Sequence, residues 1–295
     1  MDGILNVNKP VGRTSFSVVA RIRKLSGEKR VGHAGTLDSP ASGVLPVCLG
    51  KATRLVEYLM DAHKTYRTRI KLGVVTDTYD AAGKIIRQAD ASNINRQQLE
   101  IVLEEFHGQI TQTPPMYSAL KQNGKRLYKL AREGITIERP GRPTTIYSIE
   151  MEGFESPVVI LKVECAKGTY IRSLAHDLGQ RLGCGAHVET LERLGYGPFD
   201  IQDAITLEDL EDAFANGLWQ ELVHPMDSVL QDWPSLVANE EQVKVIRNGG
   251  SLAADDLSGL EGRRRCRVYD EAGGLIAILQ YNETDSRWQS EKVFA

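Results

Sequence analysis

The sequence has few cysteines, and they are not arranged as in a metal site or a disulfide framework. Cys48, Cys165, Cys184 and Cys266 are scattered without C-x-x-C spacing, which predicts reduced thiols and no zinc site. No Walker sequence or other nucleotide-cofactor loop is found, and no cluster of metal-ligand residues. Internal repeats and low-complexity tracts are also missing. We therefore expect neither a cofactor nor a metal.

Long apolar runs are missing as well. No stretch approaches the length needed to span a membrane, and no basic segment followed by an apolar one marks a signal peptide at the N-terminus. We therefore expect a cytoplasmic protein that does not contact a membrane.

The composition is that of an ordinary globular protein. With 295 residues, 41% of them hydrophobic and 25% charged, the chain is long enough for one large domain and a small one. A core of this size needs no disulfide or metal to hold it together.

The net charge of −3 disfavours a nucleic-acid partner, but the charges are segregated along the chain. Residues 1–30 and 121–142 each hold seven Lys or Arg against two acids, whereas residues 203–241 hold ten acids and no Lys or Arg. A polyanion responds to the local field, so the basic segments are candidate RNA contacts. Each of them also fits a solvated face without a ligand.

Residues 32–47, GHAGTLDSPASGVLPV, place one carboxylate among small, turn-forming residues. Gly32 and Gly35 permit backbone angles and close approaches that a Cβ would obstruct, and Asp38-Ser39-Pro40 favours a turn. The apolar residues 44–49 predict a buried strand or the start of a short helix. On this pattern alone, Asp38 is more typical of a turn or cap residue than of a catalyst.

The whole pattern G-H-A-G-T-L-D-x-x-A-x-G-V-L-P-V resembles the signature of the TruB family, the tRNA pseudouridine-55 synthases. The resemblance implies that Asp38 is the catalytic nucleophile and that His33, in a loop, contacts RNA near the flipped base. A solvent-facing loop histidine is the alternative for His33. Ser39 stands where family members commonly have proline, so we expect a slightly altered turn and an intact site.

The N-terminal residues also resemble TruB-type synthases. A strand over residues 3–8 ends at Lys9-Pro10-Val11-Gly12, and Thr14 or Ser15 then caps a helix. In the family the Lys-Pro loop supports the active site, which makes Lys9 a candidate substrate-binding residue. A plain turn between strand and helix explains the same residues.

Residues 63–73 alternate as in a strand, with Tyr66 and Thr68 on one face. A strand tyrosine is commonly a packing residue. The resemblance to the family's K-x-Y element implies instead that Tyr66 stacks on the target base and takes part in proton transfer. Residues 76–83 match a T-D-T-x-D-x-x-G loop whose acids we interpret as ordering the loop, with no chemistry.

Residues 112–121 match the family's Q-x-P-P-x-Y-S-A-x-K segment, and the paired prolines exclude a helix at its start. A basic amphipathic helix is expected over residues 124–132. Lys125 and Arg126 are therefore candidate RNA-binding residues, with plain solvated helix positions as the alternative.

A buried strand over residues 158–165 leads to G-T-Y-I-R at 168–172 and a helix that ends near residue 183. An arginine at such a junction commonly caps the helix or pairs with a neighbour. The resemblance implies that Arg172 pairs with Asp38, and that Tyr170 and Leu191 form walls of the base pocket.

The expected fold class is α+β: a pseudouridine synthase fold with a central mixed, mainly antiparallel sheet flanked by helices, plus a small C-terminal PUA-like β-barrel. We expect a catalytic domain over residues 1–232, with an RNA-gripping insertion at about 84–142. A PUA-like RNA-binding domain would follow over 233–295, on a looser resemblance than the others.

The resemblance implies an isomerase that converts the T-loop uridine of tRNA, by base flipping and with Asp38 as nucleophile. Attack on the ribose and attack on the pyrimidine both remain open. A guide-RNA-dependent H/ACA-type synthase and a non-catalytic tRNA-folding chaperone are the alternatives. The expected partner is the T-stem loop of tRNA, bound by a monomer.

Overall fold

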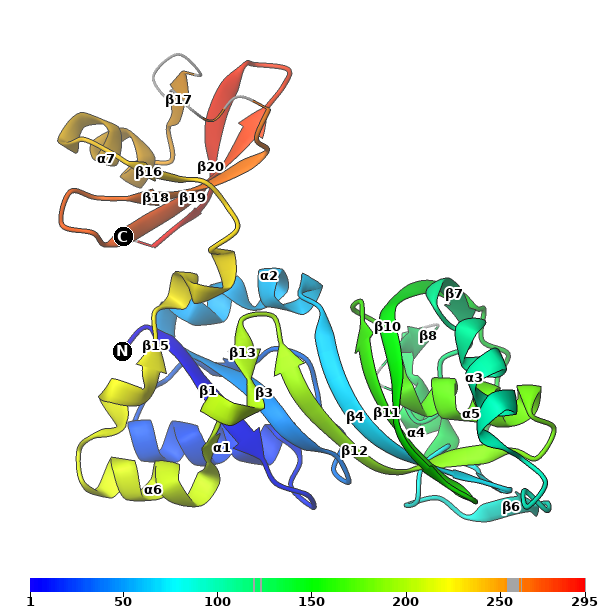
Figure 1. Ribbon diagram of the computed structural model, residues 1–295. Helices are drawn as coiled ribbons and strands as arrows, with labels where there is room; N and C mark the ends of the chain where they lie inside the picture. The colour runs from blue at the N-terminus through cyan, green and yellow to red at the C-terminus, as the bar shows by residue number, and fades with distance from the viewer. Residues whose placement is uncertain (119, 123, 254–259, 261, 295) are drawn as a thin grey trace. The chain divides into compact units, whose positions relative to one another are not determined.

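The computed structural model describes residues 1–118, 120–122, 124–253, 260 and 262–294. The chain divides into two compact units, residues 1–224 and 225–295 (Figure 1). The division falls earlier than the boundary expected after residue 232. The reason is local: Asp227 bonds to Tyr269, and Arg267 binds the Gln231 carbonyl, so the segment after His224 is anchored to the second unit.

Over its described residues, the first unit is built on one large mixed sheet and six α-helices. Its strands are β1 (Gly3–Lys9), β2 (Val31–His33), β3 (Ser42–Leu49), β4 (Lys64–Leu72), β5 (Val74–Thr76), β6 (Ile85–Gln88), β7 (Gly108–Gln112), β8 (Lys121–Gln122), β9 (Lys125–Arg126), β10 (Arg142–Glu155), β11 (Val158–Cys165), β12 (Ala186–Tyr196), β13 (Phe199–Asp200), β14 (Ile205–Thr206) and β15 (Val223–His224). Its helices are α1 (Ser15–Ser26), α2 (Val56–Asp61), α3 (Arg96–Glu104), α4 (Leu127–Arg132), α5 (Ile171–Arg181) and α6 (Leu207–Ala215), with 3-10 turns η1 (Gly50–Leu55), η2 (Ile201–Asp203) and η3 (Trp219–Leu222).

The main sheet runs in the order β14-β1-β3-β12-β4-β11-β10-β7, with β2, β13 and β15 paired at its sides. The β1–β14 and β3–β12 pairs are parallel and the other pairs are antiparallel. This confirms the expected mixed, mainly antiparallel sheet. Residues 44–49, for which strand and helix were both open, belong to strand β3.

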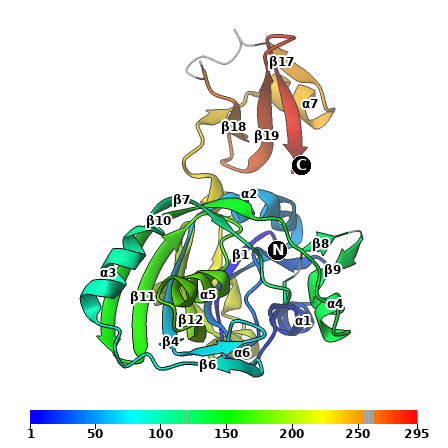
Figure 2. The ribbon, with the colours of Figure 1, turned by 90° about the vertical axis from the view of Figure 1, so that its right-hand side faces the viewer.

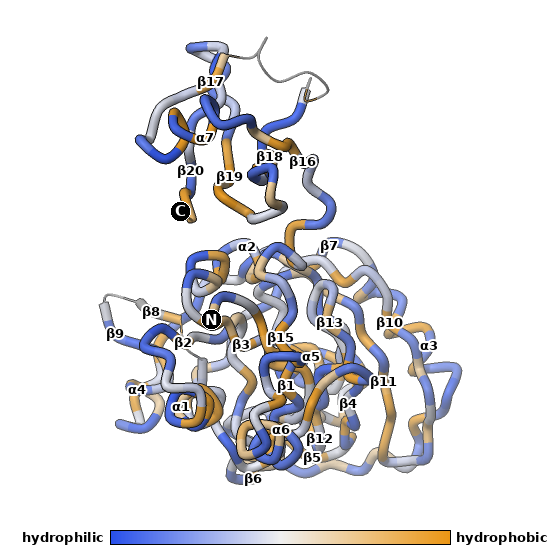
Figure 3. The backbone as a smooth tube through the Cα atoms, turned by 90° about the vertical axis from the view of Figure 1, so that its left-hand side faces the viewer, coloured by the Kyte–Doolittle hydropathy of each residue, from blue (hydrophilic) through white to orange (hydrophobic). Residues whose placement is uncertain are grey.

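Helices α1 and α6 cover the β1–β3 part of the sheet. Thr14 caps α1 by accepting a hydrogen bond from the Ser17 backbone, and Gly27 ends the helix in the left-handed conformation. Val18 and Ile22 of α1 then pack in one buried cluster with Leu5. Figure 3 shows the hydrophobic residues along β1 and on α1 that form this contact.

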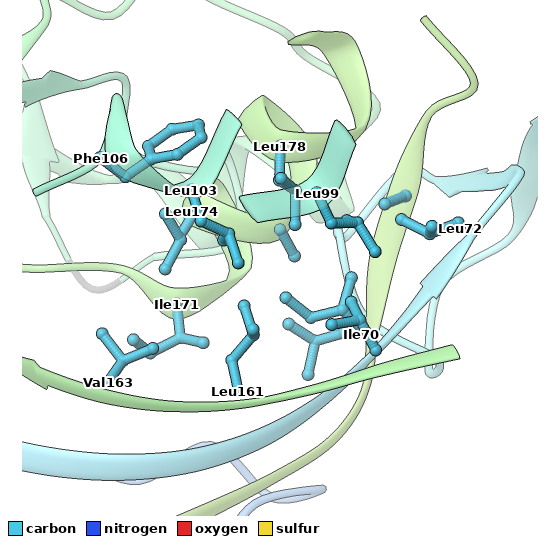
Figure 4. Packing of buried hydrophobic residues seen from close by; sticks show 14 of the residues in the cluster. Ile70, Leu72, Leu99, Leu103, Phe106, Leu161, Val163, Ile171, Leu174 and Leu178 are labelled. Atoms are coloured by element: carbon cyan, nitrogen blue, oxygen red, sulfur yellow. The ribbon is translucent and has the colours of Figure 1, made fainter. Parts of the chain in front are cut away.

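Helices α3 and α5 cover the other part of the sheet, over β10 and β11 (Figure 2). Asn95 caps α3 in a reciprocal capping box with Gln98. Figure 4 shows Leu161 of β11 facing Leu103 and Leu174 of the two helices. This core fixes the first turn of α5, from which Arg172 projects.

The second unit is a curled five-stranded sheet in the order β16-β18-β19-β20-β17. Its elements are η4 (Met226–Leu230), β16 (Ser235–Val237), α7 (Glu240–Arg247), β17 (Ser251–Ala253), β18 (Arg265–Tyr269), β19 (Leu275–Asn282) and β20 (Arg287–Val293). Its separate core contains Ile246 of α7 and Trp288 of β20. A curled small sheet agrees with the expected PUA-like module.

The helix expected over residues 124–132 is shorter than predicted. Lys125 and Arg126 form strand β9, which pairs with β8, and only Leu127–Arg132 is helical. Gly124 adopts φ +79°, which turns the chain between the two strands and prevents a helix from starting there. Ala119, in the matched segment before it, lies outside the described residues.

Candidate active site

Asp38 lies in a turn that its neighbours hold firmly. The Ala41 amide donates to the Asp38 carbonyl at 3.1 Å, which closes the predicted turn despite Ser39. The Ser15 hydroxyl accepts from the Leu37 amide at 2.9 Å and donates to the Leu37 carbonyl at 3.0 Å. On the other side, the Gly12 amide donates to Ser39 at 2.8 Å. The β1–α1 loop therefore positions the carboxylate.

Arg172 reaches Asp38 from the first turn of α5. One of its terminal nitrogens lies 2.8 Å from Asp38 Oδ2 and donates to the Tyr117 carbonyl at 2.9 Å, while the other donates to the Thr78 carbonyl at 3.3 Å. The Arg172 side chain is only 9% exposed, whereas that of Asp38 is 44% exposed. The buried Arg172 guanidinium is thus bonded through both terminal nitrogens, and the Asp38 carboxylate that it holds stays accessible.

Asp80 also pairs with Arg172, whereas the sequence analysis assigned this residue no role beyond ordering its loop. Its Oδ2 lies 3.3 Å from Arg172, and its Oδ1 accepts from Thr78 Oγ1 at 2.6 Å and from the Ala82 amide at 3.0 Å. The signal that could have found it is the T-D-T-x-D match itself. A motif acid beside a buried arginine balances that charge.

Asp38 faces a cavity of about 540 Å³. Tyr66, Tyr170 and Leu191 line it together with Asp38 and Arg172. The structure therefore brings together all three predicted catalytic residues and both predicted wall residues. With Tyr196, three tyrosines and one carboxylate line the cavity, a composition suited to a flat, uncharged ring.

Arg193 is a residue that the sequence analysis missed. It is 1% exposed, and its guanidinium donates to the Val44 carbonyl at 2.7 Å and the Gly35 carbonyl at 3.1 Å. It also lies 4.8 Å from the Tyr196 ring centroid. No carboxylate among the described residues pairs with it. The hydrogen-bond donors of Arg193 thus hold two segments that flank Asp38.

Two glycines allow this packing. At Gly35, φ is +67° and a Cβ would lie 2.7 Å from the Tyr196 ring. At Gly43, φ is +106° and a Cβ would lie 2.2 Å from the Arg193 backbone. Gly32 is different: a Cβ there would meet only a Thr53 methyl at 3.8 Å, so the requirement expected at Gly32 was wrong.

Burial tunes the titratable groups around the cavity. Desolvation raises the pKa of the Asp38 carboxyl, and the charge of Arg172 acts in the opposite direction. Its accessible surface faces the confined cavity, which explains why partial exposure and desolvation coexist. Desolvation also raises the pKa of the Tyr66 hydroxyl, with Arg193 opposing it. Tyr66 therefore stays a neutral phenol at pH 7.

Lys9 does not lie where we expected. It is fully buried, and its ammonium donates to the carbonyls of Arg13 at 2.7 Å, Pro10 at 3.0 Å and Ser39 at 3.5 Å. Desolvation lowers its pKa to about 8. A buried ammonium bound to carbonyls cannot contact a phosphate directly, so its effect on a substrate passes through the Asp38 turn.

His33 is the last residue of strand β2 rather than a loop residue, because Val31–His33 pairs with β3. Its Nδ1 is buried and has no hydrogen-bond partner among the described residues. Desolvation lowers the pKa of His33, and the charge of Arg193 adds to this, so the ring is neutral at pH 7. Lys125 and Arg126 are exposed on the β8–β9 hairpin.

Across the described part of the chain, no group of three or more His, Cys, Asp or Glu side chains is arranged to hold a metal ion. Within the same residues, no helix combines the length and apolar character needed to cross a bilayer.

The fold is that of pseudouridine synthases. The structure of a Cbf5–Nop10–Gar1 complex matches with a TM-score of 0.77 and 30% identity, over 99% of this chain and 85% of that one. The structure of an H/ACA RNP bound to a substrate RNA containing 2′-deoxyuridine matches with a TM-score of 0.76 and 28% identity, over 99% and 85% of the two chains.

Sequence comparison narrows the assignment. The model of the TruB family pseudouridylate synthase N-terminal domain matches residues 23–171, and that of the tRNA pseudouridylate synthase B C-terminal domain matches residues 172–231. The tRNA pseudouridine synthase B of Dehalococcoides mccartyi strain BAV1 is 46% identical, over 100% of this chain and 97% of its own. That of Clostridium perfringens strain 13 is 44% identical, over 96% of each chain. This chain belongs to the TruB family of pseudouridylate synthases.

Proposed function

We propose that this protein isomerises a uridine of tRNA to pseudouridine, that the uridine is the T-loop residue at position 55, and that Asp38 is the nucleophile. The observation that carries the proposal is the accessible carboxylate of Asp38, held 2.8 Å from buried Arg172 at the wall of an aromatic cavity. Close similarity over the full chain to enzymes named tRNA pseudouridine synthase B supports tRNA as the substrate.

The substrate uridine must leave its stack to reach Asp38. Flipping costs about a few kcal/mol, and stacking on an aromatic side chain returns about 1–3 kcal/mol. Tyr66 lines the cavity and supplies that surface. Tyr170 and Leu191 bound the same space and exclude water from the detached base.

The isomerisation breaks the bond between ribose C1′ and uracil N1 and forms one between C1′ and C5. Asp38 forms a transient covalent bond, either to ribose C1′ as the C1′–N1 bond breaks or to the pyrimidine ring, and this bond breaks again as or after the C1′–C5 bond forms. Arg172 favours the ionised form of the Asp38 carboxylate and fixes its orientation toward the cavity. The hydrogen on C5 leaves at the end as a proton, and N1, released from the ribose, takes up a proton, so the base gains one proton for the one that it loses. We propose that the Tyr66 hydroxyl relays the proton, passing its own on as it accepts the one from C5. Electrons balance without an oxidant or reductant.

The RNA phosphates outside the cavity require positively charged side chains to bind them. We propose that Lys125 and Arg126 bind phosphates of the T-stem loop, because both are exposed on the β8–β9 hairpin. We propose that His33, which is half-buried at the end of β2, contacts the RNA beside the flipped base. We also propose that the curled C-terminal unit, which we expected over residues 233–295, is an RNA-binding module.

The protein acts as a monomer in the cytoplasm under this proposal. Asp38, Asp80, Arg172 and Tyr66 all come from one chain, so the site needs no residue from a second copy.

Tritium release from a single tRNA transcript labelled at uridine C5 tests the function. The pure protein should release one equivalent and place pseudouridine at position 55. A guide-RNA-dependent synthase would release none without a guide and partner proteins. A pure chaperone would speed tRNA folding and release none under any condition. The Asp38→Asn variant is the matched control, since it should bind the same transcript without release.

A further inference from the structure

The mouth of the Asp38 cavity is bordered by two segments that carry an ion pair. Met60 and Lys64, on either side of the α2–β4 connection, line the cavity, as do Lys167 and Gly168 of the β11–α5 loop. Lys167 Nζ lies 2.5 Å from Asp61 Oδ1, and both side chains are 64% exposed. The pair therefore joins two rim segments while both of its charges remain solvated.

The two lysines of this rim differ in what holds them. Lys64 is buried and donates to the carbonyls of Met60 at 2.7 Å and Ala62 at 2.5 Å, so its charge is committed to the protein. Lys167 is held by an exposed carboxylate. Exposed ion pairs contribute little to stability because both partners are well hydrated, so another anion can replace Asp61 at small cost.

The rim carries a second cation. Arg142, at the start of β10, is exposed and lines the same cavity. Its strand is bonded to the Lys167 loop, because Thr144 Oγ1 lies 2.6 Å from Thr169 Oγ1 and the Ala166 amide donates to the Thr145 carbonyl at 2.9 Å. A nucleotide whose base enters the cavity must leave its two flanking phosphates at this rim, where these cations lie.

We propose that Lys167 binds a backbone phosphate next to the flipped nucleotide, and that Asp61 holds the Lys167 side chain until the phosphate displaces it. This proposal rests on the proposed function for its RNA ligand. It assigns Lys167 a contact with substrate and assigns Asp61 the role of a competing anion.

Salt-dependent binding of a T-stem-loop hairpin transcript to the full chain tests this assignment. Lys167→Gln should weaken binding by about three- to tenfold and lower the slope of log Kd against log salt by about 0.7–0.9, the value for one lost phosphate contact. Asp61→Asn should tighten binding by about two- to fivefold, because the competitor is removed. A pair that only braces the rim would move both variants in the same direction.

The Arg96–Glu100 pair on α3, about equally exposed at 56% and 53%, is the matched control. Glu100→Gln removes the same charge as Asp61→Asn and should leave Kd unchanged; equal tightening by both would overturn the proposal. In the Lys167→Gln background, Asp61→Asn should no longer tighten binding, and persistence of the effect would also overturn it. Lys167→Arg should keep the salt slope.

Different results would contradict the proposed function and the phosphate contact of Lys167. Absence of pseudouridine in the hairpin after incubation with the wild-type chain contradicts the proposed function. An unchanged Kd and slope for Lys167→Gln, with wild-type turnover intact, contradicts only the phosphate assignment.

Discussion

The two units of this protein each contain a buried arginine bound to carbonyls and carboxylate, with different outcomes. Arg172 is 9% exposed and pairs with Asp38 and Asp80. Arg267 is 10% exposed, lies 3.7 Å from Asp227, and donates to the carbonyls of Trp233 at 3.1 Å and Gln231 at 3.3 Å. Both use a guanidinium to hold segments distant in sequence.

The difference lies in the carboxylate. Asp38 is 44% exposed and faces a cavity, whereas Asp227 is 16% exposed and accepts a hydrogen bond from the Tyr269 hydroxyl at 2.5 Å. A carboxylate that is mostly buried among protein donors serves to stabilise the fold. One that keeps an accessible oxygen beside a cavity can act as a nucleophile. The exposure of the carboxylate, rather than the ion pair with arginine, distinguishes Asp38 from Asp227.

Replacing Asp38 should have the largest effect. Asp38→Asn should lower kcat by on the order of 10⁴-fold or more, because the nucleophile is lost while the shape remains. Folding raises the pKa of Asp38, so its ionised form costs stability at neutral pH, and the neutral amide should not lower the melting temperature. Tritium release and thermal unfolding measure the two effects. Full activity would remove the nucleophile assignment.

Replacing Arg172 should damage both activity and stability. Arg172→Gln leaves buried Asp80 unpaired, which should lower the free energy of unfolding by about 3–5 kcal/mol. The same variant should lower kcat by about 10²–10³-fold because the Asp38 carboxylate is no longer held in its orientation. Adding Asp80→Asn should recover part of the stability and none of the activity. Recovery of activity in the double variant would show that Arg172 serves only the fold.

Replacing Arg267 is the counterpart in the second unit. Arg267→Gln should destabilise that unit by about 3–5 kcal/mol, since Asp227 is left without its cation. Turnover at saturating tRNA should be unchanged. Hydrogen exchange of the β18 amides reports the local loss. A fall in kcat like that of Arg172→Gln would break the distinction between the two arginines.

A smaller effect is expected from alkaline pH. The pKa of Lys9 is lowered to about 8, so kcat/KM should decline as pH rises through about 8 and the ammonium loses a donor to the Asp38 turn. Lys9→Arg should move the decline to higher pH. Between about pH 8 and pH 10.5, Lys9 is protonated in the unfolded state and largely neutral in the folded state. Lys9 therefore contributes a free energy of unfolding that increases as pH rises through this range. We therefore expect activity to fall over this pH range without a loss of melting temperature from Lys9, and a decline that Lys9→Arg does not move would exclude Lys9 as its cause.

The smallest effect is expected on the β8–β9 hairpin. Lys125→Ala or Arg126→Ala should weaken tRNA binding a few-fold and lower the salt slope by about 0.7–0.9 each, with kcat unchanged. Arg263→Ala, in the second unit, tests whether that unit binds RNA in the same way. An unchanged slope in the hairpin variants would place the RNA footprint elsewhere.

Much of the fold could be predicted because local signals agree with it. Thr14 caps the helix that its position predicts, and the alternation of residues 64–72 gives strand β4 its buried face. The error at residues 124–126 arose because a periodic basic segment fits a helix, while Gly124 with positive φ favours a hairpin. The spacing of apolar side chains alone cannot decide between a helix and a strand when an adjacent segment offers a pairing partner, as β8 does for β9.

The site was predicted less completely than the fold. Three separate motifs pointed to Asp38, Tyr66 and Arg172, and the structure places these residues together around one cavity. Arg193 was missed because an arginine on a strand resembles a solvated residue until its surroundings are known. Lys9 was misplaced for the same reason, since burial of a lysine depends on the carbonyls that surround it.

The order of residues by itself determined where most helices and strands lie, which segment carries the candidate carboxylate, and which family the chain resembles, since caps, periodicity and motifs are local. Only the tertiary structure decided which charges are buried, which carbonyls they bind, and which carboxylate keeps an oxygen open. The physical reason is that the free energy of a charge depends on desolvation and on partners contributed by distant segments. Asp80 lies 92 residues before the arginine that it balances, and only the folded sheet brings them to 3.3 Å.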